Sequence, residues 1–322
     1  MTGLVSTIIP VYNRPQLLLD AVESVLAQTY QPIEVIIVND GSSDETGRVA
    51  DELAANHLAL IRVLHVSNGG PGRAREAGRK AAHGEFIQYL DSDDLLLPRK
   101  FERQVSALRD HPECGIAYGM TLFGKVGEDP PRVPHKGTGQ QHDYLFPALL
   151  QGRWWSTNTP LYRRCVCEQI GPWAPLTNEE DWEYEARAAA LWIRLCYCHN
   201  FLSVTRSHDP AQHLCHLGTS DPAKLRDRAI AHELILGHAQ TAGIGLDLPE
   251  MQHFARELFL LSRQCGAAGL AEESQTLFHL ARVASTPERA AGWDFRLYGQ
   301  AANLLGWDRL GRVACALDRL RP

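Results

Sequence analysis

The first hundred residues alternate between short apolar runs and longer segments with helical spacing of their apolar positions. The short runs are rich in β-branched residues, which is typical of buried strands, whereas the longer segments repeat apolar residues every three or four positions. The pattern predicts strands over residues 5–12, 33–38, 61–66 and 85–90, and helices over 15–28, 42–56, 72–83 and 98–110. Such alternation indicates an α/β fold with a mostly parallel sheet covered on both faces.

Two of these strands lead directly into acidic residues. Asp40 follows the second strand, and the run Asp91-Ser92-Asp93-Asp94 follows the fourth. Because ligands of open α/β sheets bind beyond the carboxyl ends of the strands, we expect these carboxylates to face one crevice. Closely spaced carboxylates are hard ligands for Mg²⁺ or Mn²⁺, the ions that hold diphosphates. After the second strand, Ser42 with Glu45 predicts a capping box that opens the next helix.

The second half of the chain has a different character. Residues 125–142 are rich in proline, glycine and charge and predict an exposed loop, either a plain connection or a segment that orders when substrate binds. A helix near 181–190 and a strand near 201–205 follow. The segments 229–238, 251–265, 271–284 and 299–304 have helical spacing. We therefore expect an α/β domain of residues 1–215 and a helical C-terminal region of residues 216–322.

Composition limits the classes of partner. The chain has 322 residues and a formal charge of −6, and it lacks the basic stripe of a nucleic-acid-binding protein. No stretch approaches the roughly 18 uninterrupted apolar residues of a membrane span. The first strand begins too early for a secretory signal peptide, and eight cysteines do not suggest a disulfide framework. These features favour a cytoplasmic protein and leave a peripheral membrane contact open.

Two Cys-x-Cys pairs, Cys165/Cys167 and Cys196/Cys198, allow two interpretations. They are either zinc ligands together with nearby histidines such as His208, or ordinary buried thiols. Structural zinc sites usually separate paired ligands by two to four residues, and a spacing of one fits a strand face more easily. The spacing therefore favours buried thiols.

The order of the motifs resembles that of inverting glycosyltransferases of family 2, which have the nucleotide-sugar-binding fold called GT-A. The resemblance covers about residues 4–210. It rests on the motifs at residues 8–13 (IIPVYN), 38–44 (VNDGSSD), 68–70 (NGG) with 74–75 (AR), 84–87 (GEFI), 90–94 (LDSDD), 171–173 (GPW), 180–182 (EDW) and 206–208 (RSH). It implies a Rossmann-like, mostly parallel mixed sheet flanked by helices, followed here by an all-α appendage.

The resemblance assigns the nucleoside end of a donor site. Tyr12 would stack on the nucleobase, and Pro10 and Val11 would shape that pocket. Asp40 would accept a hydrogen bond from the base imide, which favours UDP or dTDP. Ordinary packing and turn formation are the alternative for Tyr12 and Asp40.

It also assigns the diphosphate end. Asp93 would bind Mn²⁺ or Mg²⁺, Asp91 would reach the ribose or the same metal, and Ser92 belongs to the same nucleotide-sugar-binding loop. Arg75 would assist the phosphates, with Arg73 and Arg79 as alternative residues for this role and an exposed helix charge as the alternative interpretation. Asp94 is left out of the ligand set because it is expected to cap the following helix.

Asp181 is the residue that the resemblance implies as the general base of a single displacement. Its acidic neighbours Glu179 and Glu180 would raise its proton affinity by repulsion. His208 stands where related enzymes often carry a histidine near the diphosphate or metal, although its surroundings are simply histidine-rich.

Four other residues complete the picture from the sequence. Trp154, Trp155 and Trp182 are either a sugar platform or core residues. Glu76 departs from the family pattern, which often has asparagine there.

The implied function is metal-dependent transfer of a sugar, of the hexosyltransferase type, from a nucleotide diphosphate to a hydroxyl of a saccharide or lipid-linked acceptor, in polysaccharide or glycan biosynthesis. A sugar nucleotidyltransferase would need a glycine-rich, arginine-containing loop after the first strand, where this chain has residues 10–14 (PVYNR). The other alternative is a non-catalytic nucleotide-sugar-binding or scaffold protein that acts through its helical tail. Homodimerisation through that tail is a further expectation.

Overall fold

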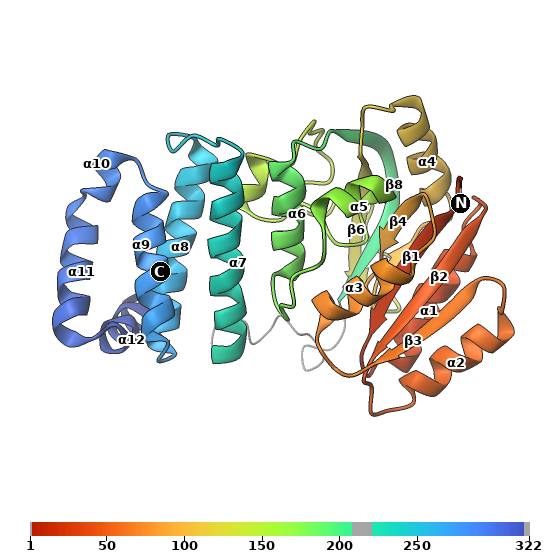
Figure 1. The fold of residues 1–322 in the computed structure, drawn as a ribbon, viewed down its shortest axis with the longest axis horizontal. Coiled ribbons are helices and arrows are strands. Elements are labelled where there is room, and N and C mark those ends of the chain that lie inside the picture. Colours follow the sequence, from red (N-terminus) through yellow and green to blue (C-terminus); the bar gives the residue numbers. More distant parts are fainter. Residues whose placement is uncertain (1, 208–220, 319–322) are drawn as a thin grey trace. The chain divides into compact units, whose positions relative to one another are not determined.

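The computed structural model describes residues 2–207 and 221–318, which fold into two compact units (Figure 1). The first is formed by the described residues of Met1–Leu145, Trp154–Tyr184 and Leu191–Asp209, and the second by those of Phe146–Arg153, Glu185–Ala190 and Pro210–Pro322. The expected boundary between residues 215 and 216 lies outside the described residues, so that division stays a prediction.

The first unit is built on an eight-stranded mixed sheet with the order β3-β2-β1-β4-β7-β6-β8-β5. The strands are β1 (Val5–Val11), β2 (Ile33–Asp40), β3 (Ile61–Val66), β4 (Phe86–Tyr89), β5 (Leu95–Leu96), β6 (Ile116–Lys125), β7 (Leu161–Arg163) and β8 (Leu195–Ser207). β1 to β4 are parallel to one another, as are β6 and β8, whereas β7 and β5 run antiparallel to their neighbours. The predicted mostly parallel sheet is confirmed.

Helices cover both faces of this sheet (Figure 1). The helices of the first unit are α1 (Pro15–Leu26), α2 (Thr46–Asn56), α3 (Pro71–Ala81), α4 (Lys100–Asp110), α5 (Arg164–Ile170) and the first half of α6 (Glu180–Ala190). The rest of α6, from Glu185, and the 3₁₀ helix η1 (Ala148–Gln151) belong to the second unit. Apolar residues of α1, α2 and α4 pack with Ile9 and Ile37 in one core cluster. Successive strand residues alternate between faces, so Ile8 points to the other face. There α3 lies so close that a Cβ atom on Gly78 would come within 2.3 Å of Ile8 Cγ2.

The start of α2 differs from the prediction. Ser42 Oγ accepts a hydrogen bond from the Asn13 backbone N–H at 3.0 Å, and the Thr46 N–H donates to Asp44 Oδ1 at 2.9 Å. The Ser42–Glu45 capping box is therefore wrong. The helix begins at Thr46 because the hydroxyl expected to cap it is used by the neighbouring loop.

The segment 125–142 is mostly exposed, as expected, and forms no helix or strand beyond Lys125. Several hydrogen bonds nevertheless hold it against β6. Thr138 is fully buried and its Oγ1 accepts a hydrogen bond from the Thr121 N–H at 3.1 Å, and the Tyr118 hydroxyl accepts one from the His142 N–H at 2.6 Å. Because the segment is polar throughout, its sequence did not indicate which of its residues would bind β6.

The two Cys-x-Cys pairs lie in different kinds of structure. Cys196 and Cys198 are buried in β8, whereas Cys165 and Cys167 lie in α5 rather than on a strand face, the first exposed and the second buried. Across residues 2–207 and 221–318, no three or more histidine, cysteine or acidic side chains are grouped to hold a metal ion. His208 lies outside the described residues.

The second unit is helical, as predicted. Its C-terminal helices are α7 (Pro222–Thr241), α8 (Pro249–Ala267), α9 (Ala271–Val283), α10 (Pro287–Ala290), α11 (Trp293–Leu305) and α12 (Trp307–Asp318). Phe259 packs against Phe278 and Phe295, with ring centroids 5.7 and 5.1 Å apart. At the crossing of α8 and α12, a Cβ atom on Gly311 would come within 2.5 Å of the Ala267 backbone nitrogen. None of the helices within the described ranges is long and apolar enough to cross a lipid bilayer.

The close contact of α8 and α12 at Gly311 predicts that glycine-to-alanine substitutions at two helix positions will change the free energy of unfolding in opposite directions. Gly311→Ala should lower the free energy of unfolding by about 1–3 kcal/mol, because the new methyl group meets the backbone of α8. Gly237→Ala in α7, where the added atom has no neighbour within 4 Å, should raise it by about 0.5–1 kcal/mol through helix propensity. Urea unfolding followed by circular dichroism measures both, and equal stabilisation by the two variants would contradict the close crossing.

Candidate active site

Three loops at the carboxyl ends of β1, β2 and β3 are fastened together by side chains. The Ser43 N–H donates to Asn13 Oδ1 at 2.8 Å. The two carboxylate oxygens of Asp40 accept hydrogen bonds from the Gly69 and Gly70 N–H groups, both at 2.8 Å. These bonds fix the loops before any ligand arrives.

The residues expected at the nucleoside end are brought together. Val11 pairs with Asn39 in the sheet, so Tyr12 and Asp40 come next on adjacent strands. Val11 is buried and Pro10 partly buried, while 46% of Tyr12 is exposed, which leaves its ring available for stacking. The turn that Asp40 holds uses about half the acceptor capacity of its carboxylate.

Arg75 joins the Asp-x-Asp loop to the start of α6. Its Nη2 lies 2.6 Å from Asp91 Oδ1 and its Nη1 lies 2.5 Å from Glu180 Oε1, while its guanidinium lies 4.9 Å from the centre of the Trp173 ring. Arg75 is buried and is therefore not an exposed helix charge. Burial alone would lower the pKa of Arg75, but the charges of Asp91, Glu180 and Asp181 outweigh it and raise that pKa.

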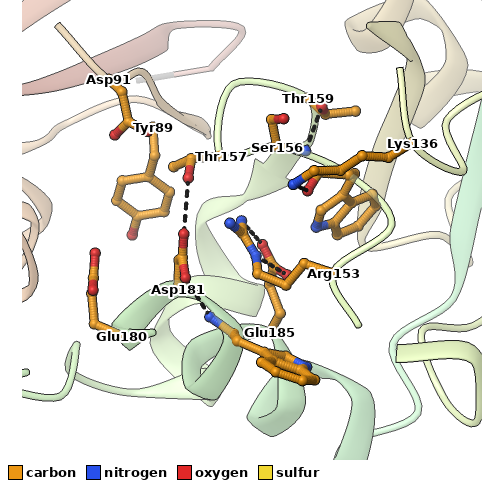
Figure 2. A network of polar contacts seen from close by, with 12 residues as sticks. Tyr89, Asp91, Lys136, Arg153, Ser156, Thr157, Thr159, Glu180, Asp181 and Glu185 are labelled. Atoms are coloured by element: carbon orange, nitrogen blue, oxygen red, sulfur yellow. Dashed lines mark hydrogen bonds and ion pairs between the residues drawn. The ribbon is translucent and has the colours of Figure 1, made fainter. Parts of the chain in front are cut away.

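The two acids that open α6 have different surroundings. The pKa of Glu180 is raised to about 7, because burial and the charge of Asp181 raise it by more than the charge of Arg75 lowers it. Asp181 is only partly buried, and its Oδ2 accepts a hydrogen bond from Thr157 Oγ1 at 3.4 Å (Figure 2). Glu180 is thus more than a repulsive neighbour of Asp181, because it anchors Arg75.

The remaining residues of the acidic loop are held one by one. Asp93 Oδ2 lies 2.8 Å from Arg14 Nη1, and Ser92 is buried. Asp94 is also buried and accepts a hydrogen bond from the Arg206 N–H at 2.9 Å. Burial raises the pKa of Asp94, and the charges of Asp93 and Asp91 add to the rise.

The expectation that Asp94 caps the next helix is wrong. That helix begins at Lys100, and the Asp94 carboxylate instead binds Thr205 and Arg206 in β8. The contact holds the acidic loop against a strand that is more than 100 residues away in the sequence.

Asp91 and Asp93 fit a divalent metal in their donor chemistry. Both offer hard carboxylate oxygens, and 32% and 14% of their side chains are exposed. Mg²⁺ is commonly held by one or two carboxylates, with waters and substrate phosphates filling the other positions. A pair of carboxylates beside a diphosphate therefore suffices.

Several other candidate residues serve packing. Trp154 and Trp155 lie edge-on to Tyr118, with ring centroids 5.2 and 5.6 Å away, so these tryptophans belong to the core; Trp182 is partly buried. Glu76 binds Arg79 through both oxygens and accepts a hydrogen bond from the Trp173 N–H.

A surface pocket of about 450 Å³ lies elsewhere in the first unit, between α4 and β8. Its lining includes Arg103, Asp110 and Arg194 and none of the expected site residues. The candidate site is therefore identified by its acidic residues at the carboxyl ends of the strands, and this pocket is not part of it.

Three contributors were not singled out from the sequence: Arg14, Arg206 and Thr157. A signal existed for Arg14, which stands immediately before the first residue of α1. A cation there is disfavoured by the positive end of the helix dipole, so its presence indicates a nearby anion. Arg206 belongs to the motif at residues 206–208 (RSH), which assigned it no role, and Thr157 carries no comparable local signal.

The fold and the position of the acidic loop define a GT-A-like nucleotide-sugar domain. Residues 6–165 match the sequence model described as glycosyl transferase family 2. The chain therefore contains a glycosyl transferase family 2 domain.

Relatives at moderate identity support this assignment. An uncharacterized glycosyltransferase, alr2836 of Nostoc sp., is 31% identical over 203 residues, covering 62% of this chain and 60% of the relative. The putative glycosyltransferase EpsH of Bacillus subtilis is 33% identical over 196 residues, covering 58% and 56%. An uncharacterized glycosyltransferase of Rickettsia felis is 35% identical over 147 residues, covering 46% and 24%. The chain thus spans less than two thirds of each of these relatives.

Solved structures share the fold at low identity. Residues 1–349 of Staphylococcus aureus TarS, in complex with UDP-GlcNAc, match with a TM-score of 0.68 and 20% identity, covering 98% of this chain and 92% of that one. The mannosyltransferase PcManGT of Pyrobaculum calidifontis, in complex with GDP-Man and Mn²⁺, matches with a TM-score of 0.53 and 18% identity, covering 98% and 86%.

The raised pKa of Glu180 predicts a stability that falls with increasing pH. Between the ordinary carboxyl pKa of 4.5 and about 7, the folded protein holds a proton that the unfolded chain has released. The free energy of unfolding should therefore decrease by about 1–3 kcal/mol across this window. Thermal unfolding between pH 4.5 and 8 checks this. Glu180→Gln should flatten the dependence and the exposed-loop variant Glu128→Gln should retain it; identical profiles for all three proteins would contradict the prediction.

Proposed function

We propose that the chain is an inverting, metal-dependent glycosyltransferase of the hexosyltransferase type. It would move a sugar from UDP or dTDP to a hydroxyl of a saccharide or lipid-linked acceptor, in polysaccharide or glycan biosynthesis. One observation carries the proposal. The buried guanidinium of Arg75 binds both Asp91 of the Asp-x-Asp loop and Glu180, the residue next to the candidate base Asp181. This shared partner supports a single site that contains both the proposed diphosphate end and the proposed base.

The nucleoside would lie against Tyr12, in the pocket that Pro10 and Val11 shape. Asp40 would accept a hydrogen bond from the N3–H of uracil or thymine with the acceptor capacity that its turn leaves over. The UDP-GlcNAc complex of TarS, which has the same fold, supports this choice, while the GDP-Man complex of PcManGT marks guanine as the competing base.

Asp93 would hold Mn²⁺ or Mg²⁺, with Asp91 as a second carboxylate. When bound, the metal ion neutralises the negative charge that develops on the diphosphate leaving group. The presence of Mn²⁺ in the PcManGT complex supports this choice of cofactor. Ser92 would keep the loop packed so that Asp91 and Asp93 stay in place.

Asp181 would act as the general base. Its carboxylate takes the proton of the acceptor hydroxyl while the hydroxyl oxygen bonds to the anomeric carbon, and the bond from that carbon to the diphosphate oxygen breaks on the opposite face. A single displacement of this kind inverts the configuration. Thr157 donates a hydrogen bond to Asp181 Oδ2 and the Trp182 backbone N–H donates one to Oδ1 at 2.8 Å, and together these bonds help to orient the carboxylate.

Calorimetric titration tests the donor assignment. UDP and dTDP should bind with Mn²⁺ at least about tenfold more tightly than GDP or CDP, because only uracil and thymine offer an imide N–H to Asp40. Asp40→Asn should reduce this preference, and Asp93→Asn should remove the effect of Mn²⁺ on UDP binding. A preference for GDP would overturn the role of Asp40, and binding of no nucleotide would favour a scaffold.

Release of UDP from UDP-sugars tests the base. Asp181→Asn should lower the rate of UDP release from UDP-GlcNAc, UDP-glucose or UDP-galactose by at least about a hundredfold, since proton transfer to the base is lost, while the affinity for UDP with Mn²⁺ stays unchanged. Asp110→Asn, an exposed site at the end of α4, is the matched control and should act like the unmodified protein. Full release by Asp181→Asn would refute the assignment.

A further inference from the structure

Arg14 occupies an electrostatically unfavourable position that Asp93 offsets. It is the residue before the first turn of α1, and its backbone N–H donates to Thr46 Oγ1 at 2.8 Å. Its side-chain Nη1 lies 2.8 Å from Oδ2 of Asp93, which stands between β4 and β5. Only 16% and 14% of the two side chains are exposed, so solvent screens this ion pair weakly.

Two nearby acids, Asp91 and Asp20, have guanidinium partners of their own. Arg75 binds Asp91, and Arg206 binds Asp20 at 2.7 Å while donating to the main-chain oxygen of Asp93. The side chain of Asp93 is bound by Arg14. The oxygen assigned above to a metal ion therefore already faces a fixed cation.

We infer that Arg14 competes with the metal ion for Asp93 and thereby makes metal binding depend on the nucleotide diphosphate. This inference rests on the proposed function. A divalent cation approaching Asp93 alone must break the ion pair and remain close to a guanidinium of like charge. A diphosphate supplies oxygens that a guanidinium binds with two parallel hydrogen bonds. Arg14 therefore exchanges Asp93 for a phosphate when nucleotide and metal bind together.

The exchange is a coupling between two ligands. Coupling between bound ligands typically changes affinity by about 5- to 150-fold, and by linkage the metal strengthens nucleotide binding by the same factor. Removing the charge of Arg14 removes this competition for Asp93, so the affinity for the metal ion alone should rise and the factor by which the nucleotide promotes metal binding should fall.

Manganese binding measured by the electron paramagnetic resonance of free Mn²⁺, with and without UDP, tests the inference on the full chain without an activity assay. Arg14→Gln should tighten binding of Mn²⁺ alone by about tenfold and reduce the factor by which UDP promotes it. Arg48→Gln is the matched control, because it removes the same charge from an exposed pair on α2 and should change neither quantity.

The outcomes separate this inference from the proposed function. If Asp93→Asn abolishes Mn²⁺ binding but Arg14→Gln leaves the affinity for Mn²⁺ alone unchanged or weaker, Arg14 is no competitor and the metal site stands. If Mn²⁺ with UDP fails to bind the unmodified protein, or binds the Asp93→Asn variant equally well, both the competition by Arg14 and the proposed metal site are refuted. Should Arg14→Gln unfold at a lower temperature, Arg14→Met, which keeps a long apolar side chain, takes its place with the same expected result.

Discussion

The structure of the candidate site depends on one buried cation. Arg75 comes from α3, and its partners come from the loop after β4 and from the start of α6, so three distant segments meet at a single guanidinium. A buried charge is tolerated only when it is paired, and loss of one partner typically costs about 3–5 kcal/mol. The pairing of Arg75 therefore constrains the acidic loop and the candidate base at the same time.

The same constraint explains the unequal properties of neighbouring acids. Glu180 and Asp181 are consecutive, yet Glu180 points to Arg75 and is buried, whereas Asp181 reaches Thr157 from a partly exposed position (Figure 2). Asp91, Asp93 and Asp94 are likewise separated by their partners, which are Arg75, Arg14 and β8. Distinct partners allow adjacent carboxylates to hold different proton affinities and different roles.

Much of the fold was predictable because its signals are local. The apolar runs and helical spacings place β1 to β4 and α1 to α4 within a few residues, and the order of strands and helices implies the parallel sheet. Hydrogen bonds across loops were not predictable in this way. Ser42 fails as a cap because Asn13 uses its hydroxyl, and the Arg75–Glu180 pair joins residues 105 apart in the sequence. Periodicity has no access to such partners, and the family resemblance implied the candidate site residues but not the bonds that position them.

The first turn of α3 relates the two ends of the donor site to each other. Asp40 holds the backbone at Gly69 and Gly70, the helix begins at Pro71, and Arg75 follows about one turn later. A helix advances about 1.5 Å and turns about 100° for each residue, so this short stretch sets both the distance and the direction between the nucleoside end and the diphosphate end. The number of residues in this stretch therefore fixes the separation of the two ends. One residue more or less would turn the guanidinium to another side of the helix, so the length of the chain between Gly70 and Arg75 is itself a requirement of the proposed donor site.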